Sequence, residues 1–167
     1  MRLILASKSP RRREILTMLG IPFEIVSADA PEVIPPGADA CAAVQAISAQ
    51  KAAAAQALLQ KKEGDDPHRI VLGADTVVAI DGGILGKPRD RAHAAQMLRR
   101  LSGRVHSVYT GLTLLQGGKR FTKAEETRVF FRELTEEEIA AYVASGEADD
   151  KAGAYALQGK GCVFVQR

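Results

Sequence analysis

Residues 69–80, RIVLGADTVVAI, constrain the fold more than any other part of the chain. Their β-branched and apolar side chains are typical of a strand that is buried inside a sheet. The dipeptide Asp81-Gly82 follows at once, and it has the turn chemistry that joins two antiparallel strands. If these are the two turn residues, the register that pairs Ile80 with Gly83 also places Thr76 opposite Lys87. The segment therefore predicts a central strand that continues into a hairpin.

Strands and helices alternate in the rest of the chain. Apolar patterns predict further strands at residues 3–6, 23–27, 104–116, 120–134 and 162–166, and helices at 10–19, 38–62, 91–101 and 135–144. Ser9 and Pro10 mark the start of the first helix, and Thr135 with Glu138 forms the capping box of the last. Proline and glycine predict loops at 28–39 and 145–161. Without repeats or low-complexity linkers, this order predicts one mixed α/β domain.

Charge and composition narrow the classes of function. The chain has 23 basic and 20 acidic residues, a net charge of +3, which is too small by itself to indicate nucleic-acid binding. Its two cysteines are far apart and lack metal-ligand spacing, which suits a reducing cytoplasm. No apolar run approaches the ~20 residues of a membrane helix. We expect a soluble, cytoplasmic protein without a membrane partner.

Three consecutive arginines fall in the first turn of the first predicted helix, at positions 11, 12 and 13. A cation at this end of the helix dipole costs roughly 0.3–1 kcal/mol. Free backbone N–H groups and guanidinium groups are together well suited to a phosphate chain, and Ser7 in the preceding loop could add a hydroxyl donor. At 100° per residue, at most two of the arginines can converge on one ligand. The alternative is a solvated basic turn.

A lysine interrupts the apolar face of the second predicted helix. Lys51 falls on the stripe that Val44, Ile47, Ala55 and Leu58 form at helical spacing. An ammonium group in that position must reach solvent or pair with an anion. The alternative is that Lys51 lies at the edge of an alanine-rich face.

Asp75 closes the apolar run of residues 70–75, and aspartate is a poor strand residue. A carboxylate at the carboxyl end of a buried strand lies where ligands bind in α/β folds, so we expect Asp75 to hold magnesium. The alternative is a turn-capping role. Glu32 or Asp29 in the proline-rich loop could add a second carboxylate. No serine or cysteine nucleophile has a recognisable histidine partner, so covalent catalysis finds no support.

Five segments taken in order, LASKSPRRREIL, SAQKA, LGADTVVAIDGGILGKPRD, MLRRLSGRVHSVYTGL and DKAGAYALQGKG, resemble those of Maf proteins, which are nucleoside triphosphate pyrophosphatases. The motifs SPRR, ADT and YxxQG are similar to those of the subgroup that hydrolyses dTTP and UTP to the monophosphate and pyrophosphate. The resemblance implies a Maf/ITPase-like α/β fold, in which helices flank a bent mixed sheet and two lobes surround a cleft.

By position, the resemblance also implies roles for single residues. Asp75 would be the proton acceptor, working with a divalent cation, Mg²⁺ or Mn²⁺, to activate water. Glu32 would be the second acidic ligand, with Asp29 as the alternative. The residues implied for base selection are Arg11, Thr76 and Gln158, and those implied for the phosphates are Arg12, Lys51 and Lys87.

Members of that family are cytoplasmic and often dimeric, so the resemblance also implies a homodimer. The chain ends at CVFVQR, where Maf proteins usually continue through another strand and a closing helix. The expected activity is metal-dependent hydrolysis of dTTP and UTP, with modified pyrimidine nucleotides as further candidate substrates. A nucleotide-binding regulator without turnover is the main alternative. An RNA-binding module is disfavoured by the modest charge and the 5% aromatic content.

Overall fold

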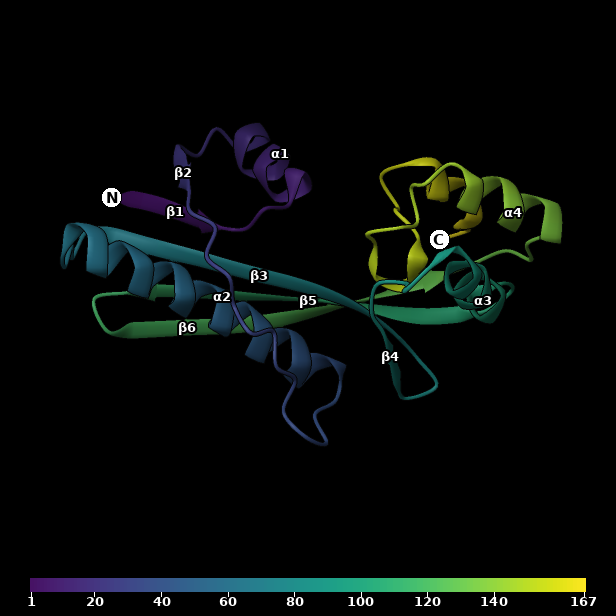
Figure 1. Ribbon diagram of the computed structural model, residues 1–167, viewed down its shortest axis with the longest axis horizontal. Coiled ribbons are helices and arrows are strands. Elements are labelled where there is room, and N and C mark those ends of the chain that lie inside the picture. Colours follow the sequence, from purple (N-terminus) through teal and green to yellow (C-terminus); the bar gives the residue numbers. More distant parts are fainter. The chain divides into compact units, whose positions relative to one another are not determined.

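Six strands form one mixed sheet in the order β2-β1-β3-β5-β6, with β4 paired to β3 (Figure 1). The computed structural model describes residues 1–167. The strands are β1 Arg2–Ala6, β2 Phe23–Ile25, β3 Arg69–Ile80, β4 Gly83–Leu85, β5 Val105–Gln116 and β6 Lys119–Phe130. The helices are α1 Pro10–Met18, α2 Ala40–Glu63, α3 Arg91–Leu101 and α4 Glu136–Ala144, with the 3₁₀ helices η1 Ala152–Ala154 and η2 Lys160–Phe164. None of the helices is both long enough and apolar enough to cross a membrane.

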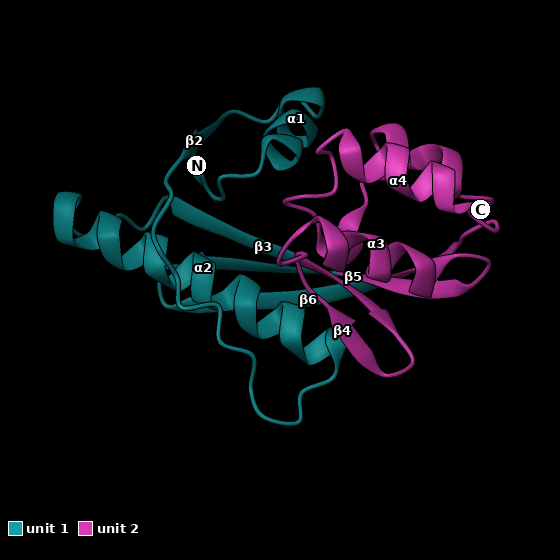
Figure 2. Ribbon diagram, turned by 45° about the vertical axis from the view of Figure 1, so that its right-hand side comes forward, with its two compact units in different colours: residues 1–75, 110–125 teal, residues 76–109, 126–167 magenta.

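The residues divide into two compact units, which Figure 2 distinguishes by colour. Unit 1 comprises residues 1–75 and 110–125, and unit 2 comprises residues 76–109 and 126–167. Strands β3, β5 and β6 each contribute residues to both units. Each unit has a hydrophobic core of its own.

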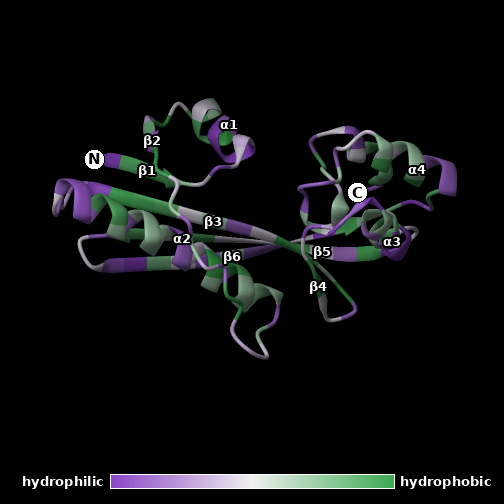
Figure 3. Cartoon of the chain, viewed as in Figure 1, coloured by the Kyte–Doolittle hydropathy of each residue, from purple (hydrophilic) through white to green (hydrophobic).

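Unit 1 buries both faces of β1 and of the first half of β3. Ile4 and Val71 pack with three buried residues of the second half of α2, whereas Leu5 and Leu72 pack with Leu16 of α1. Figure 3 shows the matching pattern, with hydrophobic colour in β1 and the start of β3. Each buried aliphatic side chain contributes about 1.5–3 kcal/mol. The prediction that the chain buries a strand here is confirmed for β1 and the first half of β3, because α1 and α2 cover their two faces.

Two glycines let α2 lie directly on the sheet of unit 1. A Cβ at Gly73 would come within 2.2 Å of the Ser48 carbonyl oxygen, and one at Gly111 within 2.3 Å of the Val44 carbonyl oxygen. A buried hydrogen bond of 2.9 Å joins the hydroxyls of Ser48 and Thr113. This contact fixes the middle of α2 against β3 and β5, and so it places the residues of α2 that flank Ser48.

Unit 2 has a core formed by α3, α4 and the ends of the long strands. Leu98 and Leu101 of α3 and Ile139 of α4 are almost completely buried there. The predicted capping box is present, because the Thr135 hydroxyl accepts from the Glu138 N–H while the Glu138 carboxylate accepts from the Thr135 N–H.

The C-terminal segment differs from its predicted strand. Residues 160–164 form the 3₁₀ helix η2 because tight turns close there, with the Cys162 N–H bonded to the Gly159 carbonyl and the Val165 N–H to the Cys162 carbonyl. Strand pairing survives as a single bridge between Val165 and Phe131. The apolar side chain of Phe164 enters the unit 2 core from this turn, so its burial does not require a strand.

Two details of register also differ. The hairpin pairs Ile80 with Gly83 as predicted, but β4 ends at Leu85, so the ladder does not reach Lys87. The Gly86 carbonyl accepts instead from the Gly153 N–H, which takes the chain out of the ladder. The apolar stripe of α2 also differs from the predicted one at its end, since Leu58 is 43% exposed and Leu59 is buried in its place.

Candidate active site

The carboxyl ends of two parallel strands meet in unit 1. The last parallel pair of β1 and β3 joins Ala6 with Gly73. Ser7 follows Ala6 directly and is buried, and Asp75 lies two residues beyond Gly73. Asp75 does not end its strand, because β3 continues to Ile80, but it lies just past the end of the parallel pairing. In α/β folds such an edge is where ligands bind.

Lys51 connects two carboxylates at this edge. Its Nζ lies 2.6 Å from Asp75 Oδ1 and 3.0 Å from Glu32 Oε1. The side chains of Lys51 and Asp75 are only 18% and 13% exposed, so solvent screens this pair less than an exposed one. The lysine that interrupts the apolar face of α2 is therefore paired with anions. These three side chains, one cation between two carboxylates, carry a net negative charge that a further cation could balance.

The loop that carries Glu32 is tied to α2. Gln50 accepts from the Val33 N–H at 2.9 Å and donates to the Val33 carbonyl at 2.7 Å. Glu32 itself has a backbone φ of 49°, a left-handed conformation that costs a non-glycine residue roughly 1–2 kcal/mol. Asp29, in contrast, is 99% exposed and pairs with Lys8 at 3.3 Å. The structure brings Glu32, and not Asp29, to Lys51.

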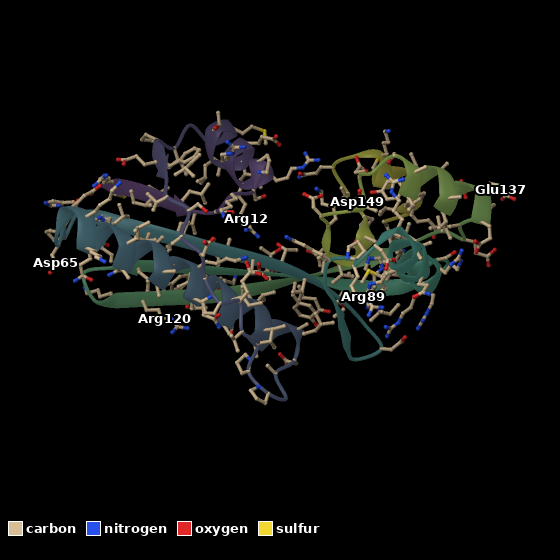
Figure 4. All side chains as sticks on the ribbon, in the orientation of Figure 1. Arg12, Asp65, Arg89, Arg120, Glu137 and Asp149 are labelled. Carbon is tan, nitrogen blue, oxygen red and sulfur yellow. The ribbon has the colours of Figure 1, made fainter.

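Arg12 lies in the first turn of α1 (Figure 4), close enough to Asp75 and Glu32 for their charges to act on its guanidinium. Its Nη1 donates to Ser7 Oγ at 3.1 Å. Burial lowers the pKa of the Arg12 guanidinium, whereas the negative charges of Asp75 and Glu32 act in the opposite direction. Ser7, Arg12, Lys51, Asp75 and Glu32 therefore form one charged cluster, which we call the unit 1 cluster.

The start of α1 is left without a side-chain cap. Ser9 occupies the N-cap position as predicted, with Pro10 next to it, but its side chain makes no capping hydrogen bond. The Ser9 N–H instead donates to Ser7 Oγ at 3.2 Å. The first turn contains no acidic residue. Arg11 has a contact of 3.5 Å with Glu14, and the Arg13 side chain is exposed.

The other three predicted site residues belong to unit 2. Thr76 is the first residue of that unit, on β3, and Lys87 is exposed in the segment after β4. Gln158 is exposed in a turn that the Gly159 N–H closes by donating to the Ala156 carbonyl at 3.2 Å.

The oxygen donors of the unit 1 cluster fit a hard divalent cation. Mg²⁺ is usually bound by one or two carboxylates together with water and substrate phosphates, rather than by a cage made only of protein groups. Asp75 and Glu32 supply two carboxylates on either side of one ammonium group. No group of three or more histidine, cysteine or acidic side chains forms such a cage. The donor set therefore suits a metal ion that arrives with a phosphate ligand.

Sequence reasoning missed the residues that hold this cluster in place. Gln50 orients the Glu32 loop, and Ser48 with Gly73 sets the position of α2. One signal was available, because a glycine inside an apolar strand pattern often marks close approach by another backbone. The role of Gln50 had no comparable signal, since it depends on the path of an irregular loop.

Fold and site together describe a mixed α/β protein with cations and carboxylates at the carboxyl ends of parallel strands. The Ham1 protein of Staphylococcus aureus shares the fold, with a TM-score of 0.53 over 78% of this chain and 72% of that chain, at 13% sequence identity. The family model described as Maf-like protein matches residues 2–167. The chain therefore belongs to the Maf-like protein family.

Relatives that are named for an enzymatic activity are similar to this chain along nearly its whole length. A dTTP/UTP pyrophosphatase of Bacillus anthracis is 48% identical over 165 residues, covering 99% of this chain and 83% of the relative. A dTTP/UTP pyrophosphatase of Bacillus cytotoxicus is 48% identical over 163 residues, covering 98% of this chain and 82% of the relative.

Proposed function

We propose that this protein hydrolyses dTTP and UTP to the nucleoside monophosphate and pyrophosphate. The observation that carries the proposal is the unit 1 cluster, in which Lys51 contacts both Asp75 and Glu32 while Arg12 lies beside the same charges. Carboxylates for water and metal, with dispersed cations for phosphate, are the groups that phosphoryl chemistry requires. The names of the relatives, at 48% identity, support the choice of substrates.

The proposed reaction breaks the bond between the α-phosphorus and the oxygen that bridges it to the β-phosphorus. Water attacks the α-phosphorus, Asp75 accepts a proton from that water, and pyrophosphate leaves with the bridging oxygen. Arg12 and Lys51 offset the charge on the phosphates, and Lys87 is assigned the same task from the family resemblance.

Lys51 gives Asp75 two states in this scheme. In the structure, the ammonium group of Lys51 lies 2.6 Å from Asp75 Oδ1. The oxygens of an incoming triphosphate compete for that ammonium group, and its movement toward them leaves Asp75 available as a base. Substrate binding and activation of the base are then linked through one side chain.

Asp75 and Glu32 would hold a divalent cation, Mg²⁺ or Mn²⁺. When bound, such an ion makes water more acidic and neutralises phosphate charge. Glu32→Gln should raise the Mg²⁺ concentration needed for the half-maximal rate. Asp29→Asn, in the same loop but 99% exposed, is the matched control and should leave that concentration unchanged. Equal effects of the two substitutions would contradict the assignment of Glu32.

Gln158 is the residue we assign to base recognition. Its amide offers an acceptor and donors, which match the alternating carbonyl and N–H edge of uracil and thymine. Cytosine has an amino group where uracil has a carbonyl, so one donor would face another. Sites built on such hydrogen bonds discriminate by roughly 10⁴-fold or more. Arg11 and Thr76 are assigned to base selection from the family resemblance alone. The same resemblance is the basis for proposing a cytoplasmic location and a homodimer.

The test is kcat/KM for dTTP, UTP, CTP, ATP and GTP, with pyrophosphate and orthophosphate measured separately. The proposal predicts that dTTP and UTP are hydrolysed well, the others poorly, and that pyrophosphate is the product. Binding of these nucleotides without turnover would instead indicate a regulatory protein. Orthophosphate as the first product would contradict cleavage at the α–β linkage.

A further inference from the structure

The turn that carries Gln158 extends from Ala156 to Gly159, and buried groups hold its N-terminal end. Tyr155, which precedes the turn, is 7% exposed, and its hydroxyl lies 2.8 Å from Nε2 of His106, which is 2% exposed. The Ala156 N–H, the first of the turn, donates to the Tyr142 hydroxyl at 3.0 Å. Both bonds are buried, so water cannot readily replace them.

Aromatic packing adds to this anchor. The rings of His106, Phe131 and Tyr155 contact one another edge to face, with centroids 4.8–5.4 Å apart. Edge-to-face pairs are worth about 0.5–1.5 kcal/mol beyond their burial. His106 therefore fixes both the hydroxyl and the ring plane of Tyr155, three residues before Gln158.

A carboxylate holds the other side of the turn. The two oxygens of Glu147 accept from the Lys160 N–H at 3.0 Å and the Gly161 N–H at 3.1 Å. Desolvation alone would raise the pKa of Glu147, but these bonds and one from the Tyr142 hydroxyl outweigh it and lower the pKa. A Cβ at Gly159 would come within 2.1 Å of Glu147 Oε1, so the backbone here follows the carboxylate closely.

None of these groups has a part in the proposed hydrolysis, yet they fix the backbone before and after one exposed amide. We propose that the His106–Tyr155 pair and Glu147 are positioning groups for base recognition, which hold the backbone of Gln158 where its amide can distinguish uracil from cytosine. This inference rests on the proposed role of Gln158. With the backbone fixed on both sides of Gln158, only its side-chain torsions remain to be ordered when the base binds, so less conformational entropy is lost than in a mobile loop.

The test compares kcat/KM for UTP with that for CTP in two conservative variants. Tyr155→Phe removes one hydroxyl and keeps the ring. Glu147→Gln replaces one acceptor oxygen by an amide that faces a backbone N–H. We expect each to lower the UTP-to-CTP ratio about tenfold, the order that one buried hydrogen bond supplies. Ser107→Ala is the matched control, because Ser107 lies next to His106 on β5 but bonds to Glu126 of β6 at 2.6 Å, so its loss should leave the ratio unchanged.

If these residues had a purely structural role, the substitutions would lower kcat/KM for UTP and CTP in parallel and keep their ratio. That result would overturn the inference. The same test is repeated in a Gln158→Ala background, where Tyr155→Phe should no longer change the ratio because both act through one side chain. If Tyr155→Phe does not fold, Glu147→Gln tests the same turn from its other side, and an unchanged ratio there overturns the inference. If the wild-type protein itself does not prefer UTP to CTP, the proposed function fails, and not only this extension of it.

Discussion

His106 should make the stability of the protein depend on pH in a way that can be isolated. Burial lowers the pKa of His106 from 6.5 to about 4, and its ring is held by Tyr155 and Phe131 rather than by a carboxylate. In the unfolded chain the ring takes up a proton near pH 6.5, whereas the folded protein resists protonation until about pH 4. The unfolded state therefore binds more protons between these values, and stability falls as the pH is lowered through them.

The size of the effect follows from the two pKa values. Between pH 7 and pH 5 the free energy of unfolding should decrease by about 2 kcal/mol because of His106. Urea denaturation at both pH values measures the decrease, and His106→Gln, which has no titrating side chain, serves as the reference. Carboxylates titrate in both proteins, so the difference between the two decreases reports His106. Equal pH dependence in the two proteins would show that the ring is not buried in its neutral form.

Other predictions concern α1 and the glycines. Arg12→Ala should lower kcat/KM for dTTP about 10²-fold or more, since it removes a preorganised cation, whereas the exposed Arg13→Ala should change it little. Equal losses, or none, would favour a solvated basic turn. Gly153→Ala should lower the free energy of unfolding by roughly 1–3 kcal/mol more than Gly118→Ala. Both glycines have positive φ, but only at Gly153 would a Cβ meet Val78, at 2.8 Å, and denaturation curves of the two variants check this.

The parts of the fold that depend only on residues close together in the sequence were predictable. The hairpin at Asp81-Gly82 and the capping box at Thr135 each need only a few consecutive residues, and both are present. The segment at 160–164 was not predictable, because a short apolar run is compatible with a strand or with a tight turn. The turn observed here buries Phe164 in the unit 2 core, and such a tertiary contact cannot be inferred from a short run of sequence.

The site shows the same division. An ammonium group inside an apolar stripe must find an anion, so the pairing of Lys51 with carboxylates could be anticipated. Which loop acid joins Asp75 at Lys51 could not be anticipated, because it depends on the two hydrogen bonds between Gln50 and the backbone of Val33. The predicted pairing of Thr76 with Lys87 assumed that the hairpin continues, whereas the chain leaves the ladder after Leu85.

Asp75→Asn tests most directly whether Asp75 is the base for hydrolysis in the unit 1 cluster. The substitution keeps the size of the side chain, and Lys51 retains Glu32 at 3.0 Å, so the protein should remain folded. The measurement is the rate of pyrophosphate release from dTTP at saturating Mg²⁺ under single-turnover conditions. We expect the rate to fall by about 10²–10⁴-fold, the usual contribution of a positioned base. A rate within a fewfold of the wild type would contradict the account.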